Sequence, residues 1–148
     1  MERRIVIYTD GASRGNPGRS ASGFSVRDGE RFESHLHYNG TATNNYAEYN
    51  AIIMALEWCL RGAGEPKELA LAIHSDSTIA VNQIKGSYKV RAEGLIPLQR
   101  RVRSLMGNFR SVSLTLVPRE NPGIVEVDRS LNRLLDRIEK EGNLPGEE

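Results

Sequence analysis

The sequence predicts an α/β domain in which helices cover both faces of a five-stranded mixed sheet. Three strand-like segments follow one another near the N-terminus with short connections, which favours an antiparallel meander. The later strand-like segments are separated by segments of helical periodicity, which favours parallel pairing. The length of 148 residues suits one domain with one core. The predicted order of elements is β-β-β-α-β-α-α-β-α.

The first part of the chain is rich in strand and turn signals. Ile5–Thr9 is apolar and β-branched and ends at Asp10, which indicates a buried strand. Gly11–Gly18 holds three glycines and a proline and is predicted to be a loop. Asp28-Gly29 is a hairpin signal between the next two strands. Strands are therefore expected at Ile5–Thr9, Ala21–Val26 and Arg31–Tyr38.

Helical periodicity begins after Thr43, which is a suitable N-cap. Asp76 or Ser77 can cap a second helix, and Pro97 suits the first turn of a third. Helices are expected at 44–60, 78–84, 96–106 and 125–140, with strands at 69–74 and 111–117. We expect residues 1–142 to form the domain and 143–148 to be a disordered polar tail.

Composition excludes several classes of protein. The formal net charge of +1 argues against nucleic-acid binding by bulk charge, so any such site must be a local basic patch. The single cysteine, Cys59, excludes an internal disulfide and a cysteine-rich zinc site, and suits a reducing compartment. We find no signal-peptide core and no apolar run of membrane-spanning length. We therefore expect a cytoplasmic monomer that does not bind membranes.

Four acidic residues occupy positions that favour a shared site. Asp10 and Asp76 end predicted strands, while Glu48 and Asp128 lie near the starts of predicted helices. Active sites of open α/β sheets form beyond the carboxyl ends of the strands. Four converging carboxylates need a counter-charge, and oxygen ligands without His or Cys favour Mg²⁺ or Mn²⁺ over zinc. Two such ions about 4 Å apart suit in-line attack on a phosphodiester.

Each acid also has an ordinary structural explanation. An Asp at the end of a strand commonly forms a turn, Asp76 can simply cap its helix, and Glu48 can be an acid favoured by the helix dipole. Asp128 competes for the fourth position with Glu120, Glu126 and Asp136. The combination of the acids in this order of elements is what indicates a metal site.

Two polar segments are candidates for binding a nucleic-acid backbone. Gly11–Gly18 resembles a phosphate-cradling loop but lacks the Lys-Ser/Thr ending of a Walker A loop, and a plain tight turn also explains it. The amides of Asn44 and Asn45 can both donate to and accept from a ribose 2′-OH, which distinguishes RNA from DNA. N-capping by Thr43 explains only one residue of that segment.

A basic cluster lies around the polar connector expected at Gly86–Gly94 and the helix that follows it. Tyr88 lies within it and can stack or pack on a sugar. The three arginines of the helix are equally well explained as a solvated helix face. The basic residues are Lys85, Lys89, Arg91, Arg100, Arg101 and Arg103.

Four motifs together resemble the ribonuclease H type 1 family, across nearly the whole chain. They are Tyr8–Gly18 (YTDGASRGNPG), Thr43–Ala51 (TNNYAEYNA), His74–Ser77 (HSDS) and Val117–Asn121 (VPREN). The resemblance implies a ribonuclease H-like fold and an endonuclease that hydrolyses the RNA strand of RNA–DNA hybrids with two Mg²⁺ or Mn²⁺ ions. It implies products with a 5′-phosphate and a 3′-hydroxyl. The chain resembles compact members that lack a long basic protrusion and a hybrid-binding module.

The resemblance also implies residue roles. Asp10, Glu48, Asp76 and Asp128 would be both metal ligands and catalytic residues. Thr43 would meet a phosphate of the DNA strand, and the minor-groove face of the RNA strand would be met by Gly11, Asn16, Asn44 and Asn45. The nucleic-acid contacts are expected at Gly11, Ser13, Asn16, Thr43, Asn44, Asn45, Lys89 and Arg91.

The chain departs from the family at two places. Many relatives have a histidine before the last helix that helps product release, but the only histidines here are His35, His37 and His74. That role is therefore unfilled or passes to Arg119 or Glu120. Relatives often have an asparagine four residues before the last Asp, where this chain has Ile124, although Asn132 does fit the pattern.

Two other functions compete with the nuclease. A catalytically inactive module of the same fold could hold hybrids or double-stranded RNA without cutting them, but such a module is expected to lose at least one of the four acids. A transposase or integrase relative would share an acidic metal site, but the Thr43–Asn45 segment and the single small domain argue against it.

Overall fold

The computed structural model describes residues 2–142, and the expected tail at 143–148 lies outside them. The strands are β1 (Arg3–Gly15), β2 (Gly18–Asp28), β3 (Arg31–Ala42), β4 (Leu69–Ser75) and β5 (Ser111–Leu116). The α-helices are α1 (Asn44–Gly62), α2 (Thr78–Lys85), α3 (Ile96–Met106) and α4 (Pro122–Glu141). Short 3₁₀ turns lie at Pro66–Glu68 and Glu93–Leu95. The predicted order of elements is confirmed.

The five strands form one mixed sheet in the order β3-β2-β1-β4-β5. β1, β2 and β3 pair antiparallel, whereas β4 is parallel to both β1 and β5. The meander and the helix-linked parallel strands expected from the sequence are both present. This is the ribonuclease H-like arrangement that the motifs imply.

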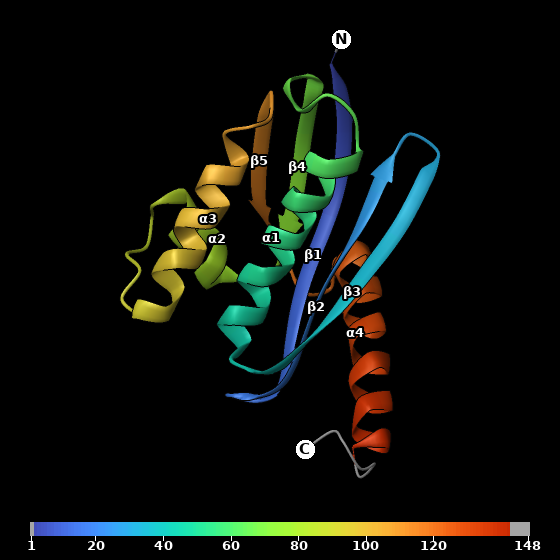
Figure 1. Ribbon diagram of the computed structural model, residues 1–148, viewed down its shortest axis with the longest axis vertical. Helices are drawn as coiled ribbons and strands as arrows, with labels where there is room; N and C mark the ends of the chain where they lie inside the picture. Colours follow the sequence, from blue (N-terminus) through green and yellow to red (C-terminus); the bar gives the residue numbers. More distant parts are fainter. Residues whose placement is uncertain (1, 143–148) are drawn as a thin grey trace.

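Helices lie on both faces of the sheet, and α4 stands apart from α1, α2 and α3 (Figure 1). Successive side chains of a strand point to opposite faces. Ile5 and Ile7 of β1 therefore pack into the main hydrophobic cluster with α1, α2 and α3. Tyr8 and Ala12 instead pack with α4 against a second, smaller cluster. The two clusters do not share a residue, so α4 is held by a small core of its own.

The prediction of a loop at Gly11–Gly18 is wrong for most of that segment, which is strand. β1 continues past Asp10 to Gly15 and pairs with β2 residue by residue, from Asp10 opposite Gly23 to Gly15 opposite Gly18. Pairing with the neighbouring strand thus overrides the turn-forming composition of the segment, and only the tip is a turn. Asp10 does not end its strand. It lies where β1 has separated from β4, because the parallel pairing stops at Tyr8.

The other element boundaries are close to those expected. Thr43 caps α1, its hydroxyl accepting a hydrogen bond from the backbone N–H of Tyr46 at 3.1 Å. Ser77 rather than Asp76 caps α2, which leaves the Asp76 carboxylate free of that role. α4 begins at Pro122 after an Asn121 cap, three residues earlier than expected. Among the described residues, none of the helices combines the length and apolar character needed to cross a bilayer.

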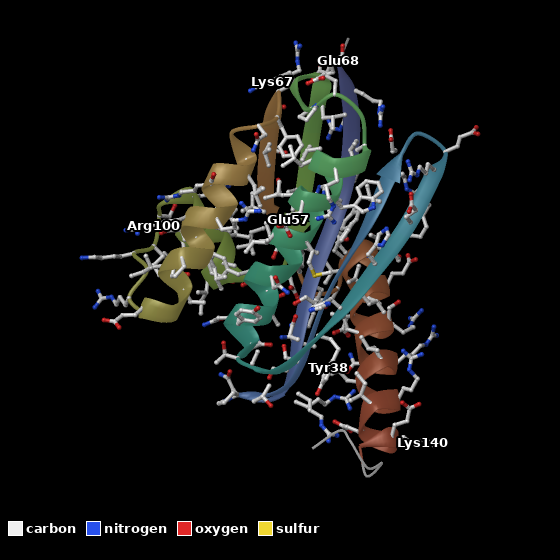
Figure 2. All side chains as sticks on the ribbon, viewed as in Figure 1. Tyr38, Glu57, Lys67, Glu68, Arg100 and Lys140 are labelled. Atoms are coloured by element: carbon white, nitrogen blue, oxygen red, sulfur yellow. The ribbon has the colours of Figure 1, made fainter. Side chains whose placement is uncertain are left out.

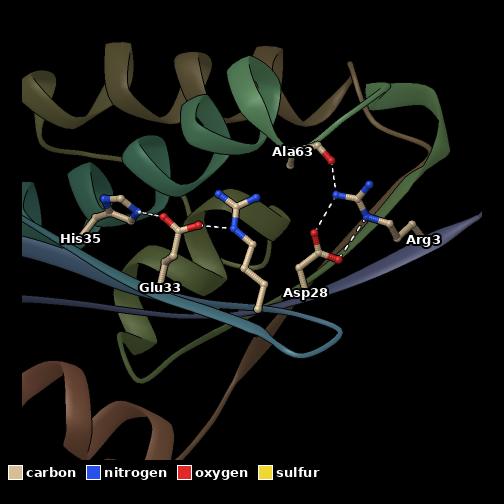
Figure 3. A network of polar contacts seen from close by, with 6 residues as sticks. Arg3, Asp28, Glu33, His35 and Ala63 are labelled. Atoms are coloured by element: carbon tan, nitrogen blue, oxygen red, sulfur yellow. Dashed lines mark hydrogen bonds and ion pairs between the residues drawn. The ribbon is translucent and has the colours of Figure 1, made fainter.

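Charged side chains fasten the end of the sheet opposite to Asp10. Arg3 at the start of β1 pairs with Asp28 at the end of β2, with 2.7 Å between Nη2 and Oδ2, and also donates to the carbonyl of Ala63 after α1 (Figure 3). On β3, Glu33 contacts both Arg31 and His35, and the contact with His35 is labelled in the same view. The contacts of Arg3 thus join the sheet to the C-terminal end of α1, whereas the acidic residues lie toward the other end of the helix.

Candidate active site

Three of the four predicted acids meet at one point. Asp76 follows the last residue of β4, Asp10 lies on the adjacent strand β1, and Glu48 lies near the start of α1. One carboxylate oxygen from each lies within 4.8 Å of the others. Asp10 is 5% exposed and Glu48 7% exposed, so two charged groups are nearly removed from water. Burial of several carboxylates at this distance is costly unless a cation or protons balance them.

Asp128 lies at the rim of the same site. It is exposed near the start of α4 and lines a cavity of about 340 Å³ together with Asp10, Glu48 and Asp76. Its charge also acts on Asp10, since it contributes to the raised pKa of that group. Ile124, which stands where relatives have asparagine, lines the same cavity and is buried. The structure therefore brings all four predicted acids together, as a tight trio with Asp128 beside it.

Gly11 explains why Glu48 lies so close to Asp10. A Cβ atom at Gly11 would lie 2.4 Å from the carbonyl carbon of Ala47 and 2.5 Å from the nitrogen of Glu48. The start of α1 therefore rests directly on the backbone of β1, and any side chain at Gly11 would push the helix away. Ser22 on β2 fixes the same turn by donating to the Ala47 carbonyl at 2.7 Å. Gly11 thus has a packing role, whatever contact it makes with a ligand.

The start of α4 is fixed on the seam between β1 and β4. Gly123 has no room for a side chain, because its Cβ would lie 2.4 Å from the ring of Tyr8. Tyr8 stacks on His74 of β4 with ring centroids 4.7 Å apart, and Nδ1 of His74 donates to the Ile7 carbonyl at 3.0 Å. Sequence reasoning had given Tyr8 and His74 no role beyond their motifs. Their contact places α4 so that Asp128 reaches the acidic trio.

The electrostatics of the site oppose full ionisation. Burial, followed by the charges of Asp76 and Asp128, raises the pKa of Asp10 to about 8. Burial and the charges of Asp10 and Asp76 raise the pKa of Glu48 well above its ordinary value. Burial also raises the pKa of Asp76, while the nearby Arg119 acts in the opposite direction. The site is therefore short of positive charge.

The donor set fits a hard divalent cation. Oε1 of Glu48 and Oδ1 of Asp76 are buried and accept no hydrogen bond from the described residues. Buried oxygens without partners are rare, and each needs an explanation. Among the described residues the ligand set consists of carboxylates alone, which match Mg²⁺ or Mn²⁺ better than softer metals. Asp10, Glu48 and Asp76 could thus hold a metal ion.

The predicted nucleic-acid residues on the β1–β2 hairpin and α1 are joined to one another. Oδ1 of Asn16 accepts a hydrogen bond from the backbone N–H of Asn44 at 3.0 Å. The Ser13 hydroxyl donates to the Ala42 carbonyl at 2.9 Å, so its donor is already used. The tip of the hairpin therefore fixes the position of the first turn of α1. Asn44, in that turn, also lines the cavity that holds the acidic residues.

A groove made of two neighbouring cavities extends from this turn toward the connector at Gly86–Gly94. Thr43 and Asn45 line a cavity of about 540 Å³ with Asn16, and Asn45 also lines a neighbouring cavity of about 500 Å³. Lys89 and Arg91, with Tyr88, line the second of these. The structure thus places the two predicted basic contacts beside the polar start of α1.

The rest of the predicted basic cluster divides. Arg101 pairs with Glu57 of α1 at 2.9 Å, and Arg103 donates to the carbonyls of Gln83 and Ile84 at the end of α2. These two arginines hold α3 to its neighbours. Arg100 is exposed on the outer side of α3 (Figure 2). The alternative of a solvated helix face therefore suits Arg100, whereas Arg101 and Arg103 bind neighbouring helices.

The loop before α4 contributes one residue to the acidic cavity. Arg119 lines it, and its charge opposes the burial that raises the pKa of Asp76. Glu120 is exposed and does not line the cavity. Of the two residues predicted to replace the loop histidine, the structure places Arg119 at the site.

Sequence comparison agrees with this geometry. A profile of the RNase H family matches residues 2–104. The chain belongs to the RNase H family. The match includes Asp10, Glu48 and Asp76 and ends within α3, so Asp128 lies beyond it.

RNase H relatives of known sequence and structure resemble the chain closely. The bifunctional protein Rv2228c of Mycobacterium tuberculosis is 33% identical over 137 residues, which are 90% of this chain and 36% of the relative. Ribonuclease HI of Halobacterium salinarum is 37% identical over 118 residues, 78% of this chain and 57% of the relative. The chain thus spans between about a third and somewhat over half of these curated relatives.

Solved RNase H structures superpose over most of the chain. The N-terminal RNase H domain of the Mycobacterium tuberculosis protein gives a TM-score of 0.84 at 30% identity, covering 95% of this chain and 99% of that domain. The Halobacterium salinarum RNase H1 gives 0.78 at 34% identity, covering 90% and 98%. LC11-RNase H1, solved in complex with an RNA/DNA hybrid, gives 0.76 at 31% identity, covering 88% and 99%.

Proposed function

We propose that the chain is a ribonuclease H that hydrolyses the RNA strand of RNA–DNA hybrids. The observation that carries this proposal is the convergence of Asp10, Glu48 and Asp76, with Asp128 beside them, in one cavity that Asn44 also lines. Family membership and the hybrid-bound relative support the substrate. The presence of all four acids disfavours the alternative of a binding module without activity.

In this proposal the acidic residues bind the metal ions and the polar residues at the start of α1 bind the substrate. Asp10, Glu48, Asp76 and Asp128 would hold two ions of Mg²⁺ or Mn²⁺, and the ions would lower the pKa of the attacking water and stabilise charge on the leaving 3′ oxygen. The products would carry a 5′-phosphate and a 3′-hydroxyl. Asn44 and Asn45 would meet ribose hydroxyls of the RNA strand, and Thr43 a phosphate of the DNA strand.

The direct test is cleavage of a set of matched duplexes. A labelled RNA–DNA hybrid should be cut in the RNA strand in the presence of Mg²⁺ or Mn²⁺ and left intact with EDTA. DNA duplex and single-stranded RNA of the same sequence should remain whole, and double-stranded RNA reveals any wider specificity. If the hybrid is bound but not cut with either ion, the chain is the inactive binding module.

We also propose that Lys89 and Arg91 contact phosphates, and that few other groups do so. Cations on the connector are the basic groups lining the groove, and no long basic protrusion accompanies them. Binding of a hybrid should therefore be weak, and its dependence on salt should come largely from these two contacts. The double variant Lys89→Ala/Arg91→Ala should reduce the slope of log affinity against log salt by about 2, roughly one per lost phosphate contact.

A salt titration of fluorescently labelled hybrid measures that slope. Arg100→Ala is the matched control, because Arg100 is exposed on α3 away from the lining of the groove. A slope that is unchanged in the double variant, or reduced equally by Arg100→Ala, would show that the connector does not carry the contacts.

Arg119 is proposed to take the place of the missing loop histidine in product release. Its guanidinium lies at the acidic cavity, where it can attract the 5′-phosphate of the product as that group leaves. Arg119→Met should lower multiple-turnover cleavage about tenfold and leave the single-turnover rate at pH 8.5 within about twofold. Equal decreases of the multiple-turnover and single-turnover rates would show that Arg119 acts before product release, in substrate binding or cleavage.

A further inference from the structure

Arg14 makes a set of contacts that the proposed function does not explain. It lies on β1 beyond Asp10, and its side chain reaches α4. The guanidinium lies 2.9 Å from a carboxylate oxygen of Asp136 and 3.0 Å from one of Glu139. It also donates to Asn132, at 3.0 Å to the side-chain oxygen and 3.2 Å to the backbone carbonyl. One side chain of the hairpin thus meets three residues of the last helix.

Asn132 extends this contact to the fourth acid. Its side-chain nitrogen donates to the backbone carbonyl of Asp128 at 2.9 Å. An arginine can only donate, so it must face the oxygen of the amide. The amide nitrogen is then directed to Asp128. Arg14 therefore fixes the orientation of the Asn132 amide, and through it a carbonyl in the turn that carries Asp128.

These polar contacts are important for keeping α4 in place because few buried apolar side chains pack the helix against the sheet. The buried cluster beneath the helix consists of Ala21, Val127, Leu131 and Leu135 and is separate from the main core. The Arg14 side chain is 29% exposed, so its bonds to Asn132 are only partly open to competition from water. The same hairpin holds the start of α1 through Asn16, so one β-hairpin touches both helices that supply acids.

We propose that Arg14 is a positioning residue for Asp128, acting through Asn132. Arg14 fixes the orientation of the Asn132 side-chain amide, and that amide fixes the helical turn of α4 that carries Asp128. The Asp128 carboxylate is thereby kept at the rim of the acidic trio. This rests on the proposed function, in which Asp128 is the fourth acid. The two ion pairs to Asp136 and Glu139 have a different task, which is to fasten the far end of α4.

Two variants separate these tasks. Arg14→Met removes the donor to Asn132 and the ion pairs together, whereas Asp136→Asn/Glu139→Gln removes only the ion pairs and keeps the donor. Both should lower the melting temperature. Only Arg14→Met should lower kcat, about tenfold, with KM within about twofold, because the substrate-binding groove is untouched. Arg137→Met, an exposed arginine of the same helix, should change none of these values.

Two further measurements make the test specific to Asp128. In an Asp128→Ala background, Arg14→Met should lower kcat by less than about twofold, because residues that act in one chain are not additive. In the metal-free protein, backbone amides of residues 128–132 should exchange about tenfold faster in Arg14→Met than in Asp136→Asn/Glu139→Gln. Equal losses of kcat in the two hairpin–helix variants, or additive losses in the Asp128→Ala background, would overturn the proposal.

Failure of this inference is distinguishable from failure of the proposed function. If the unmodified chain does not cut a hybrid with Mg²⁺ or Mn²⁺, the nuclease itself is wrong and a positioning role falls with it. If the chain cuts the hybrid and Asp128→Ala cuts equally well, the nuclease stands and only the role of Arg14 is refuted.

Discussion

Asp10→Asn should abolish cleavage of RNA–DNA hybrids and, at the same time, make the metal-free protein more stable. Asp10 is at the centre of the acidic group, since its charge raises the pKa of Glu48 and its own pKa responds to Asp76 and Asp128. An amide cannot replace its negative charge as an ion ligand, so we expect a loss of about 10³-fold or more. The buried carboxylate also opposes folding, and its removal should stabilise by on the order of 1–2 kcal/mol.

Cleavage of labelled hybrid in Mg²⁺ and in Mn²⁺, together with urea unfolding in EDTA, measures both effects. Glu126→Gln is the control, because Glu126 is an exposed acid of α4 that does not line the cavity. It should keep its activity and its stability. An Asp10→Asn protein that still cuts, or that is less stable than the unmodified chain without metal, would contradict the assignment.

The metal-free protein should lose stability as the pH rises from about 4 to about 8. The pKa of Asp10 is about 8 in the folded protein and near the ordinary 3.8 in the unfolded chain. Below pH 4 Asp10 is protonated in both the folded and the unfolded state, so the free energy of unfolding does not depend on its titration there. Between these values the folded state keeps a proton that the unfolded state releases, so the free energy of unfolding falls by at most about 1.4 kcal/mol per pH unit. Above pH 8 the loss is complete.

Divalent ions should reverse that loss, most strongly at the high end of the range. An ion binds the ionised carboxylates of the folded protein, so its affinity rises as protons leave. At 100 times its dissociation constant, Mn²⁺ should add about 2.7 kcal/mol to the free energy of unfolding. Urea unfolding from pH 4 to pH 8.5, with EDTA and with Mn²⁺, tests this, and Asp10→Asn should show a flatter profile and a smaller response to Mn²⁺. Identical profiles for the two proteins would show that Asp10 is not the group responsible.

The sequence predicted the order of elements and the four acids because these depend on local signals. Alternation, helical periodicity and the caps at Thr43 and Ser77 are each contained within a few residues. Glu48, Asp76 and Asp128 were found because strand ends and helix starts meet at one edge of such a sheet. Asp10 was found although its strand was predicted to end too early, because it lies just beyond the point where β1 stops pairing with β4. The weakest prediction, Asp128, is also the one whose helix lies beyond the family match and reaches the site from the other face.

Other features depend on pairing between distant segments, which the sequence does not show. Gly11–Gly15 has the composition of a loop, yet it is a strand because β2 pairs along it. Its glycine at position 11 is required by the start of α1, which is far along the chain. Arg101 and Arg103 counted toward a basic patch, but their partners on α1 and α2 give them structural roles. The contact between Arg14 and Asn132 likewise joins residues that are 118 positions apart.

The separate core beneath α4 has a consequence for heat inactivation. Regions with few buried apolar contacts open at a lower free energy than the body of a domain. Lifting α4 alone takes Asp128 away but leaves Asp10, Glu48 and Asp76 on the sheet and on α1. Warming should therefore abolish the proposed hybrid cleavage while most of the circular dichroism signal persists, and cooling should restore cleavage without refolding of the main core.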